Sequence, residues 1–155
     1  MHASHRLLTV AAAVLALSAP AATLAQAGAP ASGTRAADDS LFRDLGGLAG
    51  IRTVVEDFVA IVLDDRRINA GFKDADLPRL KDKLAEQFCE LAGGPCQYSG
   101  KDMQTIHDGL NITMAQFNAL AEDLQLALER NGVPTRVQNR LIAKLAPMYR
   151  QIVTR

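Results

Sequence analysis

His107 is the residue of this chain whose type and surroundings are best suited to chemistry. The other two histidines, His2 and His5, lie in an N-terminal segment that resembles a removable export signal. Met103, Ile106 and Leu110 share with His107 the i, i+3, i+4, i+7 spacing of one helix face. We therefore expect the single remaining imidazole to lie among apolar side chains on a buried face.

A buried imidazole has two interpretations. It can be a core histidine that donates a hydrogen bond to a backbone carbonyl, which helical spacing alone favours because intermediate burial is ordinary for histidine. Alternatively, it can be an axial ligand of haem iron, which requires a neutral imidazole held among apolar side chains. The chain has no CxxCH motif, so any haem would be held without thioether bonds.

Residues 1–27 resemble a secretory signal, with a weakly cationic start, an alanine- and leucine-rich run and a closing A-x-A pattern. We predict cleavage after Ala27, with Ala25 as the second choice. A transmembrane anchor is the alternative, and Pro20 and the small residues argue against it. A periplasmic or secreted location follows, with no membrane segment after cleavage and a flexible Ala-, Gly-, Ser- and Pro-rich leader over 28–39.

Two cysteines, Cys89 and Cys96, flank the turn-forming sequence Gly-Gly-Pro at 93–95. They are either a disulfide pair or two buried thiols. Export would permit oxidation, and the short closed loop would then stabilise the fold by about 2.5 kcal/mol at most. We predict the disulfide.

The charge of the chain argues against a nucleic-acid partner. Its 17 basic and 17 acidic residues cancel, and removal of Arg6 with the signal leaves 16 against 17, a net charge of about −1. There is no basic block and no tryptophan, so the electrostatic pattern that binds phosphate backbones is absent.

Apolar periodicity predicts one all-helical domain over residues 40–155. Asp76 and Pro78 mark a helix start, and Thr113 with Gln116 forms a second start signal of the capping-box type. Pro147 should kink the last helix. The predicted helical segments are 41–45, 49–63, 77–91, a short segment around His107, 114–131 and 135–153, and residues 68–72 are predicted to be a short connector.

The order of several short motifs resembles the truncated haemoglobins, specifically the group I bacterial globins. These motifs are LGG at 45–47, VVEDF at 54–58, Phe72, AGGP at 92–95, YSG at 98–100, Met103, His107, IT at 112–113, Phe117 and GVP at 132–134. The resemblance implies a two-over-two helical sandwich around a non-covalent haem b, with His107 as the proximal iron ligand. It also implies that ten residues line the haem slot, although each taken singly is more often plain core: Phe72, Leu80, Leu84, Phe88, Tyr98, Met103, Ile106, Ile112, Phe117 and Leu120.

The side of the slot that would face a bound gas departs from the family pattern. Many members have tyrosine where this sequence has Val59, and glutamine where it has Leu84. Leu80 is also apolar, and Gln87 is the nearest polar residue on the same helix. Loss of a donor to bound dioxygen costs roughly 1.5–3 kcal/mol, or one to two powers of ten in affinity, which argues against tight oxygen storage and against nitric-oxide dioxygenation.

Lys83, beside Leu84, lies where some relatives place a side chain that closes on the iron as sixth ligand. A lysine can bind iron only when it is deprotonated, which requires desolvation. A solvated lysine, or one that contacts a haem propionate, is the alternative that we favour.

The resemblance implies a haem-binding globin that reversibly binds dioxygen, nitric oxide or carbon monoxide through His107-ligated iron, in the range of oxygen binding and transport. The N-terminal signal adds the expectation that it is exported. One alternative is an electron-transfer or redox-sensing haem protein with six-coordinate iron and an unknown redox partner. Another is a haem-free helical module, against which His107, Phe72 and Phe117 argue. Any nitric-oxide or dioxygen redox chemistry is left open, and weak peroxidase activity is expected because no distal acid–base group is evident.

Overall fold

The computed structural model describes residues 38–155, and the predicted signal segment 1–27 and most of the leader 28–39 lie outside this part. Between residues 38 and 155 the regular structure is entirely helical, as predicted. No helix in this range is both long and apolar enough to cross a membrane. The elements are α1 (Ser40–Asp44), α2 (Gly47–Asp64), η1 (Asn69–Phe72), α3 (Leu77–Leu91), α4 (Met103–His107), α5 (Met114–Arg130), α6 (Thr135–Leu145), η2 (Ala146–Met148) and α7 (Tyr149–Ile152).

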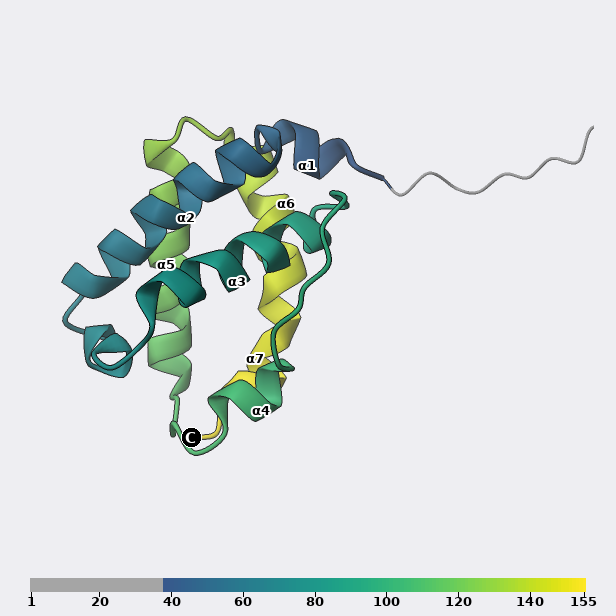
Figure 1. The fold of residues 1–155 in the computed structure, drawn as a ribbon. Helices are drawn as coiled ribbons and strands as arrows, with labels where there is room; N and C mark the ends of the chain where they lie inside the picture. The colour runs from purple at the N-terminus through teal and green to yellow at the C-terminus, as the bar shows by residue number, and fades with distance from the viewer. Residues whose placement is uncertain (1–37) are drawn as a thin grey trace, which may run out of the picture. The chain divides into compact units, whose positions relative to one another are not determined.

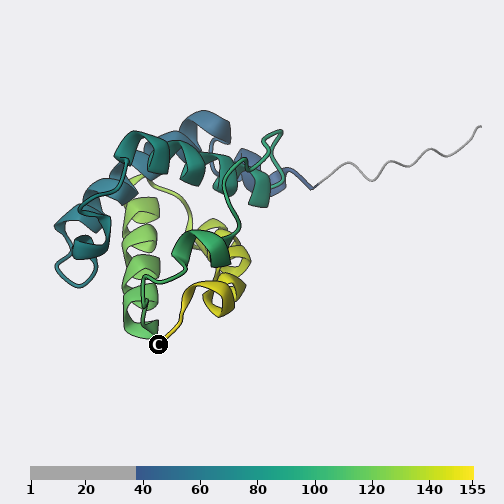
Figure 2. The ribbon, with the colours of Figure 1, turned by 60° about the horizontal axis from the view of Figure 1, so that its bottom comes forward.

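Two helix pairs make up the body of this domain. In Figure 1, α2 and α3 lie side by side and cross the second pair, which α5 forms with α6 and α7. The short helix α4 lies below α3, near α7, and Figure 2 brings it forward between α3 and the C-terminal helices. This arrangement is the two-over-two sandwich that the sequence predicted.

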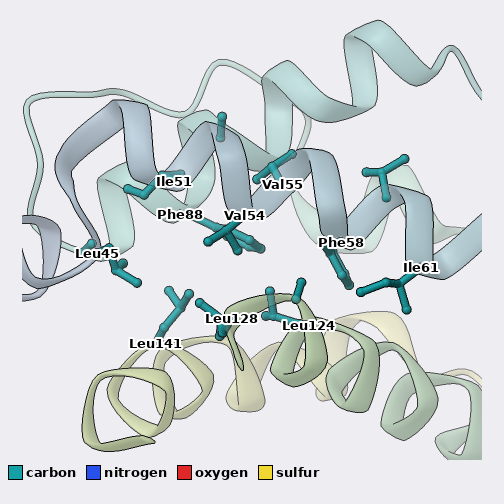
Figure 3. Close-up of a cluster of buried hydrophobic side chains, with 14 of the residues drawn as sticks. Leu45, Ile51, Val54, Val55, Phe58, Ile61, Phe88, Leu124, Leu128 and Leu141 are labelled. Atoms are coloured by element: carbon teal, nitrogen blue, oxygen red, sulfur yellow. The ribbon is translucent and has the colours of Figure 1, made fainter. Parts of the chain in front are cut away.

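The core lies where the two pairs cross. Figure 3 shows Val54 and Phe58 of α2 pointing toward Leu124 and Leu128 of α5. Leu128 is fully buried, with 0% of its surface exposed. Burying a leucine side chain completely contributes about 1.5–3 kcal/mol, so these contacts hold the pairs together.

Local sequence signals set the helix ends as predicted. The Asp76 carboxylate accepts a hydrogen bond from the Arg79 N–H at 3.2 Å and caps α3. Thr113 and Gln116 form the predicted capping box of α5, with N···O distances of 3.2 and 3.0 Å. Pro147 lies in η2, which separates α6 from α7, because proline cannot donate the backbone hydrogen bond that a continuous helix needs.

One prediction about the His107 segment was wrong. Helix α4 ends at His107, and Gly109 has a positive φ of 75° that turns the chain away from the helix. Leu110 consequently leaves the shared face, and 58% of its surface is exposed. Ile106 is not buried either, since 47% of its surface is exposed, although it lines the cavity described below. Spacing could not place Leu110 because helical periodicity applies only while the helix continues.

Cys89 and Cys96 form a disulfide, with their Cα atoms 5.7 Å apart. Cys89 is fully buried near the end of α3, and Cys96 packs against the same core. The bond ties the segment that leads to Tyr98 to the last turns of α3.

Candidate functional site

A largely apolar cavity of about 380 Å³ lies between α3, α4 and the pair formed by α5 with α6 and α7. Its volume falls within the range of about 300–1,000 Å³ that is usual for sites that hold small molecules or cofactors. Helix α3 forms one wall with Leu80 and Leu84, whereas α4 contributes His107 to the lining. The cavity is therefore built from segments far apart in the sequence.

A second hollow of about 510 Å³ lies over α2 and α3 and has a different character. Its charged side chains pair with one another: Arg52 with Asp82 at 3.4 Å, and Lys81 with Glu56. Because these charges already neutralise each other, the apolar cavity is the better candidate for a binding site.

Most of the residues predicted to line a slot do line this cavity. The eight that do are Leu80, Leu84, Phe88, Tyr98, Met103, Ile106, Phe117 and Leu120. Phe72 does not, because η1 directs it against the core beside α2. Ile112 does not either; it lies in the loop before α5, where its carbonyl accepts a hydrogen bond from the Thr154 N–H at 3.0 Å.

The imidazole of His107 is oriented by its own helix. Its Nδ1 atom lies 2.7 Å from the carbonyl oxygen of Met103, one turn earlier in α4. A carbonyl can only accept, so Nδ1 carries the proton and, in the neutral ring, Nε2 keeps its lone pair. The hydrogen bond to a backbone carbonyl that the first interpretation predicts is present, and it leaves the other ring nitrogen without a backbone partner.

The sequence matches a protein family, and the helical sandwich with one oriented histidine in an apolar cavity agrees with that match. Residues 40–154 match the family of bacterial-like globins. This chain belongs to that family. Group 1 truncated hemoglobin GlbN of Mycolicibacterium paratuberculosis is 35% identical over 115 residues, which cover 74% of this chain and 85% of the relative.

Solved structures agree with this assignment. Truncated hemoglobin from Tetrahymena pyriformis in its Fe(III) form is 28% identical, with a TM-score of 0.72 over 74% of this globin and 98% of that chain. The 2/2 hemoglobin from Synechococcus sp. PCC 7002, in the cyanomet state and with covalently attached heme, is 26% identical. Its TM-score is 0.66 over 72% of this globin and 94% of that chain.

Sequence reasoning missed part of the cavity wall in this globin. The additional lining residues are Phe58, Asn118, Ala121, Leu124, Ile142, Leu145, Ala146, Met148 and Ile152. Helical periodicity predicts only which face of each helix points inward. It could not separate side chains that fill the core from those that border a cavity, because that depends on how the helices pack.

The residues predicted to face a bound gas were Val59, Leu80, Leu84 and Gln87, and one of them does not line the cavity. Leu80 and Leu84 line the cavity, but Val59 is only 2% exposed and is packed into the core. Its neighbour Phe58 lines the cavity instead. Successive residues of a helix point about 100° apart, so a small rotation of α2 decides which of the two faces the cavity.

Lys83 lines the cavity but is engaged in an ion pair. Its Nζ lies 2.9 Å from a Glu86 carboxylate oxygen and 2.5 Å from the Ser99 hydroxyl. The hydrogen bond from Lys83, together with the backbone and hydroxyl hydrogen bonds from Ser99, lowers the pKa of Glu86 to about 2. Glu86 is therefore a carboxylate at neutral pH, and the Lys83 amine is occupied by its contacts with Glu86 and Ser99.

Two further polar side chains of the lining differ in how well they are partnered. The Tyr98 hydroxyl donates to the carbonyl of Lys101 at 2.9 Å, and burial raises its pKa. The Gln87 amide nitrogen instead lies 3.4 Å from the sulfur of Met103 and 3.9 Å from that of Met148. Thioether sulfur is a weak acceptor, so the Gln87 donor has no strong partner.

Proposed function

We propose that this globin binds haem b non-covalently, with His107 as the proximal iron ligand, and that it reversibly binds dioxygen, nitric oxide or carbon monoxide. The observation that carries the proposal is the oriented imidazole of His107 in an apolar cavity, with Nε2 available as a ligand. Haem iron supplies the site for the gas and the capacity to change redox state. The protein binds the haem, orients it and forms its surroundings.

The residues present fit a non-covalent haem. Phe88 of α3 and Phe117 of α5 offer aromatic surface to a flat macrocycle. Both cysteines are joined in the disulfide, so neither thiol is available for a thioether bond. Lys83 lines the cavity and contacts the Ser99 hydroxyl, and its ammonium group suits the propionate groups of a haem.

The residues around the cavity would each contribute a physical effect. The hydrogen bond from Nδ1 of His107 to Met103 fixes the orientation of the ring and leaves Nε2 as the ligand nitrogen. Leu80 and Leu84, which line the cavity from α3, would exclude water from the space beside the haem. Since neither can assist proton transfer, we expect peroxidase activity to be weak, and a turnover comparable to that of dedicated haem peroxidases would contradict this view.

The pairing of Lys83 with Glu86 supports gas binding over six-coordinate electron transfer. Ligation by Lys83 would require the loss of a proton and of the contacts to Glu86 and Ser99. Both losses cost free energy, so an open sixth position is the simpler state.

Export of the protein is a separate proposal. We propose that residues 1–27 direct it to the periplasm or the medium, with cleavage after Ala27. The disulfide supports an oxidising compartment. Cell fractionation combined with the intact mass of the mature chain tests this proposal, and an uncleaved cytoplasmic protein would refute it.

An absorption spectrum of the purified mature protein tests the proposed function. It should be recorded as isolated, after dithionite reduction and after addition of carbon monoxide. We expect a haem b Soret band that shifts readily with carbon monoxide. Low-spin bands that resist carbon monoxide would favour the electron-transfer alternative, and the absence of a Soret band after haem addition would refute haem binding.

A further inference from the structure

The cavity contains several polar side chains, but most of them already form a hydrogen bond or an ion pair within the protein. The Lys83 ammonium pairs with Glu86, the Tyr98 hydroxyl donates to the Lys101 carbonyl, and Nδ1 of His107 faces the carbonyl of Met103. Asn118 lies on the solvent-exposed side of α5. Gln87 is therefore the half-buried donor of the lining that lacks a strong acceptor.

Little free energy is lost when Gln87 exchanges its present contacts for another hydrogen-bond acceptor. Its Nε2 atom is directed at two thioether sulfurs, at 3.4 and 3.9 Å. A partly buried amide is unfavourable unless it is hydrogen-bonded, and a thioether satisfies it poorly. A more polar acceptor that entered the cavity would therefore compete well for this donor.

Gln87 lies on the α3 wall of the cavity, and its amide reaches Met103 of α4. Leu80, Leu84 and Gln87 follow one another at spacings of four and three residues, so they share one helix face, and all three line the cavity. His107 enters from α4 instead. The glutamine side chain has three rotatable bonds, which lets its amide move within the cavity.

We propose that Gln87 is the residue that determines gas specificity, by donating a hydrogen bond from Nε2 to iron-bound dioxygen. This inference rests on the proposed haem function. Ferrous iron transfers partial negative charge to dioxygen, whereas bound carbon monoxide acquires little. A hydrogen bond to a charged acceptor is the stronger kind, so Gln87 stabilises the dioxygen complex selectively.

The test compares Gln87→Met with the parent protein and with Gln104→Met. Methionine is close to glutamine in size but has no N–H donor, and Gln104 is an exposed residue of α4 outside the cavity. Dioxygen and carbon monoxide dissociation rates are measured on the ferrous proteins. We expect Gln87→Met to release dioxygen roughly tenfold faster and to leave carbon monoxide release within about twofold, whereas Gln104→Met changes neither rate.

The outcomes separate this inference from the proposed function. An unchanged dioxygen rate in Gln87→Met, or equal acceleration of both gases, would overturn the role of Gln87 while haem binding stands. Should Gln87→Met fail to fold, resonance Raman spectra of the parent dioxygen complex in H₂O and D₂O replace it. An isotope shift of the iron–oxygen stretch supports a donor, and no shift overturns the inference. A parent protein without a Soret band would refute the haem function itself.

Discussion

The Nδ1 atom of His107 and the carbonyl oxygen of Met103 lie 2.7 Å apart across one turn of α4. This pair fixes the tautomer of the ring, because a carbonyl accepts and cannot donate. The lone pair is therefore on Nε2, the nitrogen that is not used by the helix. A helix of only five residues thus both positions the imidazole and selects the tautomer of its neutral form.

His107→Ala should abolish normal haem coordination, since no other histidine occurs between residues 38 and 155. The Soret band of the reconstituted protein should weaken and shift, and added free imidazole should restore it in part. Gln104→Ala, on the exposed side of the same helix, serves as the control. An unchanged Soret band and unchanged carbon monoxide affinity in His107→Ala would remove the proximal assignment.

Leu84→Gln should slow dioxygen dissociation by about one to two powers of ten, because it adds a donor on the cavity wall opposite α4. Stopped-flow displacement of dioxygen by carbon monoxide measures the rate. Leu84→Met is the matched control, since it keeps the size and the apolar character of the side chain. An unchanged or faster dissociation rate would show that Leu84 does not face the bound gas.

Removal of the disulfide with the double variant Cys89→Ala/Cys96→Ala should lower the free energy of unfolding by up to about 2.5 kcal/mol. The bond restricts the unfolded chain, so its loss makes the unfolded state more favourable. Urea unfolding measures the change, and the parent with added reductant should approach the variant. Equal midpoints for the oxidised parent and the variant would contradict a stabilising role.

Asp123 should make stability depend on pH. It is 5% exposed, and its Oδ2 atom has no hydrogen-bond partner in the described structure. Burial and the charge of Asp65 raise its pKa, and the charge of Glu122 adds to this effect. Arg67, 3.7 Å away, opposes it only in part. The folded state therefore binds the proton more tightly, so this stabilising contribution is complete below the unfolded pKa and is lost as pH rises through the folded pKa.

Asp123→Asn should consequently flatten the pH dependence. We expect a free energy of unfolding about 1 kcal/mol higher than the parent at pH 7, because a buried charge without full hydrogen bonding is removed. Urea unfolding between pH 4 and pH 8 measures the effect. Asp108→Asn, at an exposed position, is the control. A parallel pH profile for Asp123→Asn and the parent would show that Asp123 does not titrate as described.

The amino-acid sequence by itself determined which segments are helical and several of the helix ends, although α2 begins at Gly47 and not at the predicted residue 49. The predicted bounds of α3 match the observed ones, and the caps at Asp76 and Thr113 form as expected. These features follow from sequence because each depends on residues within one or two turns. His107 could be singled out for a similar reason, as the histidine with apolar neighbours at helical spacing.

Only the tertiary structure decided which inward-facing side chains border the cavity. Phe58 lines it while Val59 does not, and Phe72 and Ile112 lie elsewhere. The partner of Lys83 was also undetermined, because Ser99 reaches it from a separate segment. Such relationships depend on the rotation and spacing of packed helices, which are set by contacts between distant parts of the chain. Periodicity identifies the buried face of a helix, but helix packing decides whether that face meets another side chain or a cavity.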